Sequence, residues 1–318
     1  MIGARAAPIR FPPLPSPLAD DEMVFLRAVV YASLFDYPLT LAQALETLVG
    51  SRDTEAGLLA MYHSSPALQT LVEYRRGLFF VRGADRLVLE RARRERASRS
   101  LLADNRRLLK LICAMPFTSL VALSGSAAHL NVGPAGGDVD LFVVTRRRQV
   151  WSVTVAIRLL AWLLRRGRTL SANFVLADTA LALDPGEQDL FCANQIVHLR
   201  PLAGGAVYCR FVEANPFVER HYPNFEADAT AIEGFAPAGR AAAVKRTVER
   251  LLAWGPSRVV EQVCRLVLAR RLRRGAATWS SPEQVRLSAD CLKLHPHSPR
   301  QSILARYDAA VDRALAQL

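Results

Sequence analysis

The chain of 318 residues has little lysine and little cysteine, and it has no long uninterrupted apolar run. Only three of its 41 basic residues are lysine, so the formal net charge of +12 is carried almost entirely by arginine. A strong positive charge favours polyanionic partners such as nucleic acid or anionic lipid. Because arginine and alanine are both abundant, the composition also fits the codon bias of a GC-rich genome. The charge alone therefore does not establish a nucleic-acid partner.

The five cysteines are scattered through apolar surroundings, at positions 113, 192, 209, 264 and 291. An odd number without a regular spacing excludes a disulfide framework and predicts buried free thiols in a reducing compartment. The six histidines have no cysteine or acidic partners at a metal-ligand spacing, so zinc is not expected. His129 is the histidine nearest to the chemically informative motif described below, and a lone histidine is more often structural.

Membrane and secretion signals are also lacking. The most apolar stretch, residues 150–164, is short for a membrane span and contains Arg158, so it predicts a buried helix. Five prolines between residues 8 and 17 interrupt any apolar core that a signal peptide would need. We therefore expect a cytoplasmic protein with no membrane partner.

The N-terminal part of the chain begins with a proline-rich segment and continues with helical patterns. Residues 1–20 lack periodicity and predict a flexible arm. Apolar spacing then predicts a helix over 24–35, and Thr40 with Gln43 forms a capping box that opens a second helix. A third helix is expected over 55–62.

Two short strands follow these helices. The β-rich segments 71–74 and 78–81 flank a glycine turn and predict a hairpin. In the order of its elements, the segment 21–83 resembles a winged-helix domain. That resemblance implies DNA binding through Arg75 and Arg76 on the wing; the alternative is a small module that packs on the next domain.

The chemically informative motif begins at an apolar strand over residues 120–123. Gly125 and Ser126 follow this strand and lead into a helix-like segment, a glycine-rich loop and a second strand over 138–144. Because side chains alternate along a strand, Asp138 and Asp140 are expected to point the same way, away from their apolar neighbours. Two carboxylates therefore lie side by side.

This carboxylate pair predicts a metal site. Two like charges in so apolar a strand are costly to desolvate and repel each other unless a cation lies between them. Hard oxygen ligands of this kind suit Mg²⁺ or Mn²⁺, which take further ligands from substrate phosphates. The backbone at Gly125 and the hydroxyl of Ser126 stand where a helix begins, which is a favourable place for phosphate.

These residues resemble the signature of the DNA polymerase β-like nucleotidyltransferase superfamily. Its pattern of Gly, Gly or Ser, a variable gap, and two acids flanking an apolar residue is met by Gly125, Ser126, Asp138, Val139 and Asp140. The resemblance covers about residues 105–225. It implies a nucleoside triphosphate as substrate, a Mg²⁺ or Mn²⁺ ion held by both aspartates, and attack by a hydroxyl acceptor on the α-phosphate with release of pyrophosphate. The acceptor would be a small molecule or a protein.

The superfamily usually carries a third acid on a later strand, and here the match is incomplete. The predicted strand over 169–178 has Asn173 in its interior and Asp178 at its far end. An asparagine can ligate a metal through its amide oxygen but cannot accept the acceptor's proton, whereas Asp178 would keep activity intact. We favour Asn173 for this position, because the family acid lies inside the strand.

Two other features have a functional and a structural explanation. The arginines at 146–148 could contact phosphates, but a basic run at a helix start is usually solvated. Asn194 and Gln195 could line an acceptor cleft or only bridge elements. From residue 229 onward the pattern is helical.

We therefore predict an α+β protein, with a small mixed sheet of nucleotidyltransferase type and flanking helices. The expected parts are a flexible arm (1–20), a winged-helix-like module with a connecting helix (21–100), a nucleotidyltransferase domain (101–225) and a helical C-terminal domain (226–318). The predicted function is metal-dependent nucleotidyl transfer. The alternatives are a catalytically degenerate nucleotide-binding regulator and a winged-helix DNA-binding regulator.

Overall fold

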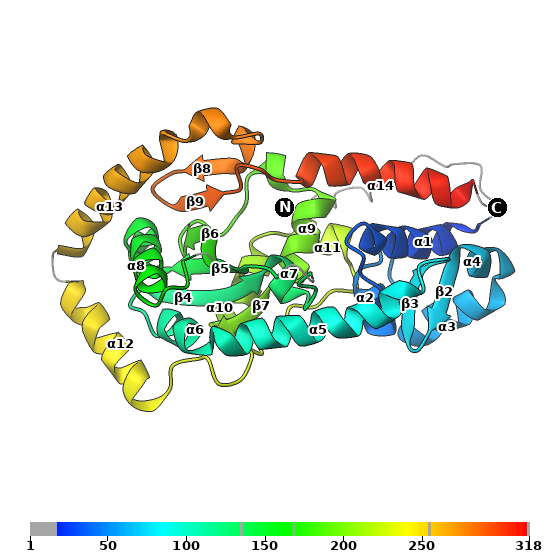
Figure 1. Cartoon of the computed structure of the whole chain (residues 1–318), viewed down its shortest axis with the longest axis horizontal. Coiled ribbons are helices and arrows are strands. Elements are labelled where there is room, and N and C mark those ends of the chain that lie inside the picture. Colours follow the sequence, from blue (N-terminus) through cyan, green and yellow to red (C-terminus); the bar gives the residue numbers. More distant parts are fainter. Residues whose placement is uncertain (1–17, 134–135, 168, 254–255, 317–318) are drawn as a thin grey trace, which may run out of the picture.

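The computed structural model describes residues 18–133, 136–167, 169–253 and 256–316, which form two β-sheets surrounded by helices (Figure 1). The predicted α+β class, with a mixed sheet and flanking helices, is confirmed. The flexible arm predicted over 1–20 lies almost entirely outside the described residues. None of the helices in the described ranges combines the length and the apolar content that a membrane crossing requires.

The N-terminal unit contains four helices and a three-stranded antiparallel sheet of order β1-β3-β2. Its elements are α1 (Asp20–Ser33), β1 (Leu39–Thr40), α2 (Leu41–Glu46), α3 (Glu55–Ser64), α4 (Pro66–Leu71), β2 (Val72–Arg75) and β3 (Leu78–Val81). The predicted capping box is confirmed, since Thr40 accepts from the backbone of Gln43 while the Gln43 side chain accepts from the backbone of Thr40. Helix α4 was not predicted, although Ser65 caps it and Pro66 begins it.

A six-stranded mixed sheet of order β7-β4-β5-β6-β9-β8 forms the centre of the molecule. Its strands are β4 (Thr118–Ser124), β5 (Val139–Thr145), β6 (Leu170–Ala177), β7 (Arg200–Ala203), β8 (Val285–Leu287) and β9 (Cys291–Leu294). Only β5 and β6 run parallel. This parallel pair needs a crossover, and the apolar segment after β5 supplies it as a helix.

Helices cover both faces of this sheet. The helices that follow the N-terminal unit are α5 (Arg86–Asp104), α6 (Arg106–Cys113), α7 (Gly125–Ala128), α8 (Val150–Leu163), α9 (Leu190–Val197), α10 (Gly205–Glu213), α11 (Phe217–His221), α12 (Gly239–Leu252), α13 (Pro256–Arg273) and α14 (Arg300–Leu315). Short 3₁₀ segments cover 146–148, 185–187, 276–278 and 282–284.

The alternation of side chains along β5 divides the interior into two apolar cores. Val139, Leu141 and Val143 pack in one core with α6, α8 and α13. Phe142 packs in the other, which runs without interruption through α9, α10 and α11 into the N-terminal unit. Asp140 shares the strand face of Phe142, so it lies on the side of the sheet that α9 and α10 cover.

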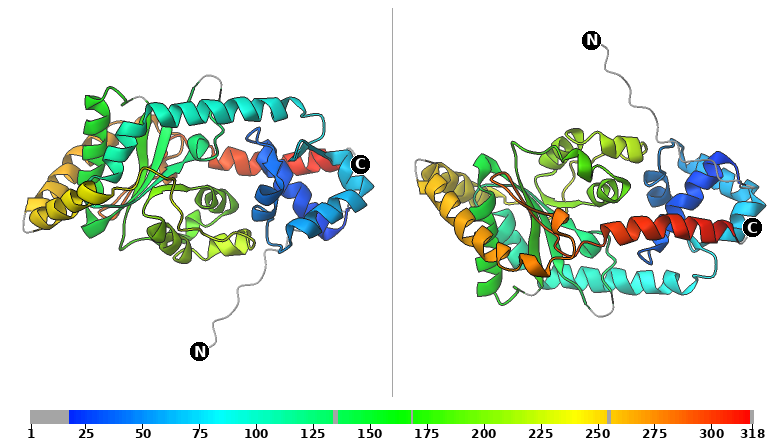
Figure 2. Two further views of the ribbon diagram at one scale, coloured as in Figure 1. Left: turned by 90° about the horizontal axis from the view of Figure 1, so that it is seen from below. Right: turned by 90° about the horizontal axis from the view of Figure 1, so that it is seen from above.

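The expectation of a purely helical C-terminal domain over 226–318 was wrong. Two strands of this segment, β8 and β9, extend the central sheet through pairing of β9 with β6. They are three and four residues long, too short to show a period-2 pattern. Helix α14 then runs alongside α1, where Tyr307 packs edge-on against Tyr31, while α12 and α13 lie at the opposite end of the molecule (Figure 2).

Candidate functional site

Gly125 and Asp140 lie against each other at one end of the β4–β5 pair. Ser124 is opposite Asp140 in the antiparallel register, and the chain turns into α7 immediately afterwards. Gly125 has a φ of +60°, in the left-handed region, and a Cβ atom at this position would lie 3.1 Å from Oδ2 of Asp140. Both the turn and the approach of the carboxylate therefore favour glycine.

The neighbouring strand β6 holds the other oxygen of Asp140. Ser171 donates a hydrogen bond of 2.6 Å from its hydroxyl to Oδ1, and the Asn173 amide donates one of 3.1 Å to the same atom. The strand pairing skips Asn173, since Ala172 pairs with Leu141 and Phe174 with Phe142, so a bulge gives Asn173 its place beside the aspartate. No described residue donates a hydrogen bond to Oδ2, which leaves that oxygen available.

Burial makes ionisation of Asp140 costly. Loss of solvent raises the pKa of this carboxyl above its usual range, and the nearby charge of Asp138 raises it further, while the hydrogen bonds from Ser171 and Asn173 partly offset the shift. Asp138 itself is exposed and directly precedes β5. A cation beside the pair would remove both the repulsion and part of the desolvation cost.

The donor set fits a hard divalent cation that takes part of its coordination from a substrate. Asp138 and Oδ2 of Asp140 supply carboxylate oxygens, and Asn173 supplies an amide of which only the nitrogen is hydrogen-bonded to Asp140 and Ser171. Among the described residues, no group of three or more His, Cys, Asp or Glu side chains could hold a metal. A site here would thus depend on two carboxylates, neutral oxygens and phosphate oxygens.

The two candidates for the third acidic position lie at opposite ends of the sheet. Asn173 contacts Asp140 directly. Asp178 follows the far end of β6, where its backbone N–H donates to the carbonyl of Thr145 at the last residue of β5. Asp140 and Thr145 are five positions apart on that strand, about 17 Å at the usual rise, so Asp178 does not reach the pair.

Two cavities meet at Gly125 and Gln195, which line both. The first, called here the Asp140 cavity, has a volume of about 290 Å³ and runs from Asp140 to Lys293 and Arg300. Lys293 forms an ion pair of 3.0 Å with Glu187, and Arg300 one of 2.6 Å with Asp189. The C-terminal segment therefore brings two cations to the far side of this cavity.

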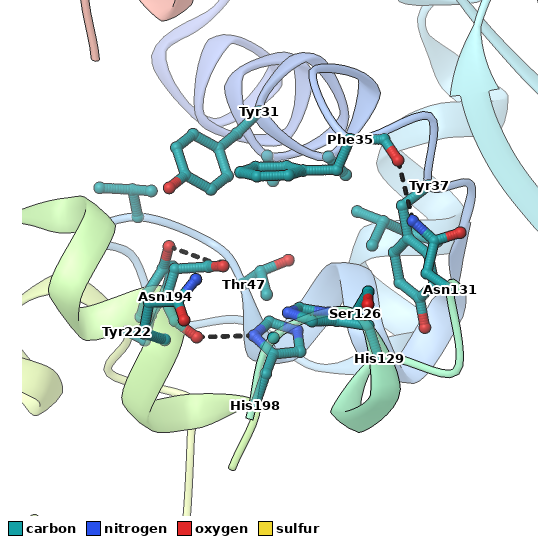
Figure 3. A pocket seen from close by; sticks show the side chains of 16 residues that line it. Tyr31, Phe35, Tyr37, Thr47, Ser126, His129, Asn131, Asn194, His198 and Tyr222 are labelled. Atoms are coloured by element: carbon teal, nitrogen blue, oxygen red, sulfur yellow. Dashed lines mark hydrogen bonds between the residues drawn. The ribbon is translucent and has the colours of Figure 1, made fainter. Parts of the chain in front are cut away.

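The second cavity, called here the α1 cavity, has a volume of about 190 Å³ and lies between α1 and the helices α7 and α9 (Figure 3). Ser126, which is exposed at the surface of the chain, is part of its wall. His129 stacks on His198 with ring centroids 4.1 Å apart, and Nδ1 of His198 is 2.8 Å from the carbonyl oxygen of Asn194. Burial, together with the neighbouring imidazole in the case of His129, lowers the pKa of both rings, so both are neutral at pH 7.

The basic residues singled out in the sequence lie away from this site. Arg148 pairs with Asp290 and Arg146 with Glu249, at the end of β5 opposite Asp140. On the β2–β3 hairpin, Arg75 pairs with Glu73 and Asp85. The described partners of these three side chains are protein carboxylates.

Comparison of the chain with family models, with curated proteins and with solved structures found no match. The site is therefore characterised by its own geometry, which unites Gly125, Ser126, Asp138, Asp140 and Asn173 and leaves Asp178 apart. Sequence reasoning missed the stacked histidine pair and the approach of Lys293 and Arg300. The partners in these contacts are about 70 to 160 residues from the motif, and no local pattern signals them.

Proposed function

We propose that the protein is a Mg²⁺- or Mn²⁺-dependent nucleotidyltransferase that moves a nucleoside monophosphate from a nucleoside triphosphate to a hydroxyl acceptor. The observation that carries this proposal is the packing of Asp140 against the turn at Gly125, with Asp138 beside it and one carboxylate oxygen to which no described residue donates a hydrogen bond. Phosphate groups and a divalent cation are the ligands that such a turn and such a pair suit best.

Each residue has a defined part in this proposal. Asp138 and Asp140 would hold the cation, which when bound neutralises phosphate charge and polarises the α-phosphate. Ser171 and Asn173 keep the Asp140 carboxylate in one orientation through their hydrogen bonds. Gly125 keeps the space in front of Oδ2 free of a side chain. The acceptor oxygen would form a bond to the α-phosphorus as the bond to the bridging oxygen breaks and pyrophosphate leaves.

The fate of the acceptor proton favours a second candidate function. The hydroxyl proton must pass to a base, and the side chains that contact Asp140 from β6 are a serine and an asparagine, neither of which is one. Asn173 therefore supports a protein that binds a metal–nucleotide complex as a signal without turning it over. Alternatively, the proton passes to a phosphate oxygen of the substrate, and transfer proceeds slowly.

Pyrophosphate release separates these candidates. The purified protein is incubated with each of ATP, GTP, CTP and UTP, with Mg²⁺ or Mn²⁺ and a mixture of hydroxyl compounds, and the Asp140→Asn variant is assayed in parallel. Asp178→Asn is the matched control, because it makes the same change at the distant end of β6. Release that Asp140→Asn abolishes and Asp178→Asn retains supports transfer, whereas metal-dependent nucleotide binding without release supports sensing. The absence of both binding and release contradicts the proposal.

A further inference from the structure

The α1 cavity has an uncharged lining. Of its 16 lining residues none is Asp, Glu, Lys or Arg, and the two histidines are held neutral by burial. In Figure 3 the rings of Tyr31 and Phe35 lie on one side of the cavity, with Tyr37 at its right-hand end, and the polar groups of Asn194 and His198 lie on the opposite side. A charged ligand would enter such a site without a counter-charge, whereas a neutral ring would keep its contacts.

A buried polar atom in the cavity wall lacks a partner. Tyr31 is only 4% exposed, and its hydroxyl makes no hydrogen bond to any described residue. An unpaired buried hydroxyl is costly, so its position points to a ligand group that pairs with it. Gln195, at the junction with the Asp140 cavity, also makes no side-chain hydrogen bond to a described residue, and the same holds for the Ser126 hydroxyl and the His129 ring.

We propose that the α1 cavity binds an uncharged ring that carries hydroxyl, amine or carbonyl groups, with Tyr31 hydrogen-bonded to it. Two kinds of ligand carry such a ring, namely the base of a nucleotide and a cyclic hydroxyl acceptor. The position of the cavity beside Gly125 and Ser126 suits either. The identification of this ring as part of a substrate rests on the proposed function. The binding of a neutral ring is independent of that function, because Asp140 does not line this cavity.

Calorimetric titration without metal tests the proposal. One arm uses adenosine, guanosine, cytidine and uridine, and the other uses phenol, catechol and cyclohexane-1,2-diol. Binding in one arm identifies the source, and binding should survive in Asp140→Asn even if transfer fails.

Loss of one hydrogen bond predicts about fivefold weaker binding for Tyr31→Phe, and Ala32→Leu, which fills the cavity, should abolish binding. Tyr307→Phe is the matched control, since it removes a buried hydroxyl outside the cavity and should leave affinity unchanged. No binding in either arm, or equal affinity in all variants, overturns the proposal.

A second observation, independent of the first, concerns the outer surface of α12 and α13. The acidic side chains of these helices bind groups in the interior, whereas many of their large apolar side chains are exposed. Glu249 accepts from the backbone N–H of Phe117, and Glu261 accepts from those of Trp151 and Ser152. The large apolar residues exposed on the two helices are Val244, Leu251, Leu252, Val259, Val260, Val263, Leu266 and Val267.

The charge of this surface is of one sign. Glu249 and Glu261 are the only acids in the two helices, and both are bound in the interior, whereas arginines flank the apolar residues, end α13 at Arg273 and continue past it at Arg274. A second copy of the same surface would bring arginine against arginine. Apolar side chains at 48 to 65% exposure along α13, flanked by arginine, instead match the surface of an anionic bilayer.

The geometry points to peripheral binding of anionic lipid by the outer faces of α12 and α13. This contact lies on the membrane without crossing it, and it differs from the absence of a membrane partner that the sequence led us to expect. The partner chemistry is a bilayer of acidic phospholipid, which accepts both the arginines and the apolar side chains.

Co-sedimentation with vesicles tests this surface. The protein should sediment with vesicles containing phosphatidylglycerol and remain in solution with phosphatidylcholine alone. Val263→Asp with Leu266→Asp should abolish sedimentation, and Arg270→Gln should weaken it about fivefold. The controls are Leu89→Asp, at a similarly exposed leucine on α5, and Arg93→Gln, also on α5. Neither substitution should change the amount of protein that sediments with the vesicles. Equal binding by all variants overturns the proposal, as does a dimer in gel filtration that Val263→Asp dissociates.

Discussion

Replacement of Gly125 by alanine isolates the contact on which the site depends. An L-residue with a backbone in the left-handed region lowers the free energy of unfolding by about 1–2 kcal/mol. The lower entropy of the unfolded chain with alanine offsets about 0.4–1 kcal/mol of this loss. The new Cβ would also lie 3.1 Å from Oδ2 of Asp140, closer than carbon and oxygen normally approach. If the carboxylate moves, its hydrogen bonds to Ser171 and Asn173 weaken, at about 1 kcal/mol each. Gly125→Ala should therefore lower the free energy of unfolding by roughly 2–3 kcal/mol.

Gly83→Ala is the matched control for this substitution. Gly83 has a φ of +84°, and a Cβ atom there meets nothing within 4 Å, so only the backbone cost of about 1 kcal/mol remains. Urea unfolding of both variants measures the difference, and a thermal-shift titration with Mn²⁺ and nucleoside triphosphates measures binding. Gly125→Ala should lose the metal-dependent shift, and Gly83→Ala should keep it. Equal destabilisation of the two variants, with binding intact in both, would refute the role assigned to Gly125.

Three further predictions concern Asp140, Asn173 and Glu261. A carboxyl whose folded pKa is raised makes its full contribution to stability below its unfolded pKa of about 3.9 and loses that contribution as pH rises through the higher folded value. Asp140→Asn should thus unfold at higher urea than wild type at pH 7, with the difference vanishing near pH 3; a gap that widens toward low pH contradicts the assignment. Asn173→Asp restores a base beside Asp140, so pyrophosphate release should rise by 10²-fold or more, and an unchanged rate would exclude base limitation. Glu261→Ala leaves two buried backbone donors of α8 without an acceptor and should cost about 2–4 kcal/mol in urea unfolding, whereas a cost below 0.5 kcal/mol would contradict the contact.

Local signals account for the parts of the fold that were predictable from the sequence. The capping box at Thr40, the hairpin around Gly77 and the alternation of β5 are each encoded within a few residues, and the structure contains all three. Strand β9 was missed because four residues carry no measurable period, and α4 because its six residues make fewer than two helical turns.

The site, too, was predictable where its residues are close in the sequence or match a known pattern, and unpredictable where distant segments meet. The proximity of Gly125 to Asp140 was implied by a strand, turn and strand order, and the place of Asn173 by the position that the third acid of the nucleotidyltransferase pattern takes inside a later strand. The cavities were not foreseeable, since Tyr31, His198 and Lys293 reach the site through tertiary packing of segments separated from Gly125 by about 70 residues or more. No periodicity reports such contacts.

The most direct test of the central claim is the binding of Mn²⁺ in the presence of each nucleoside triphosphate, followed by electron paramagnetic resonance. Wild-type protein and Asp178→Asn should bind the metal–nucleotide complex, and Asp138→Asn and Asp140→Asn should each bind it at least tenfold more weakly, because each removes one of two carboxylate ligands. Equal Mn²⁺ binding by all four proteins, or none by wild type with any nucleotide, would contradict the assignment of this aspartate pair as a metal–nucleotide site.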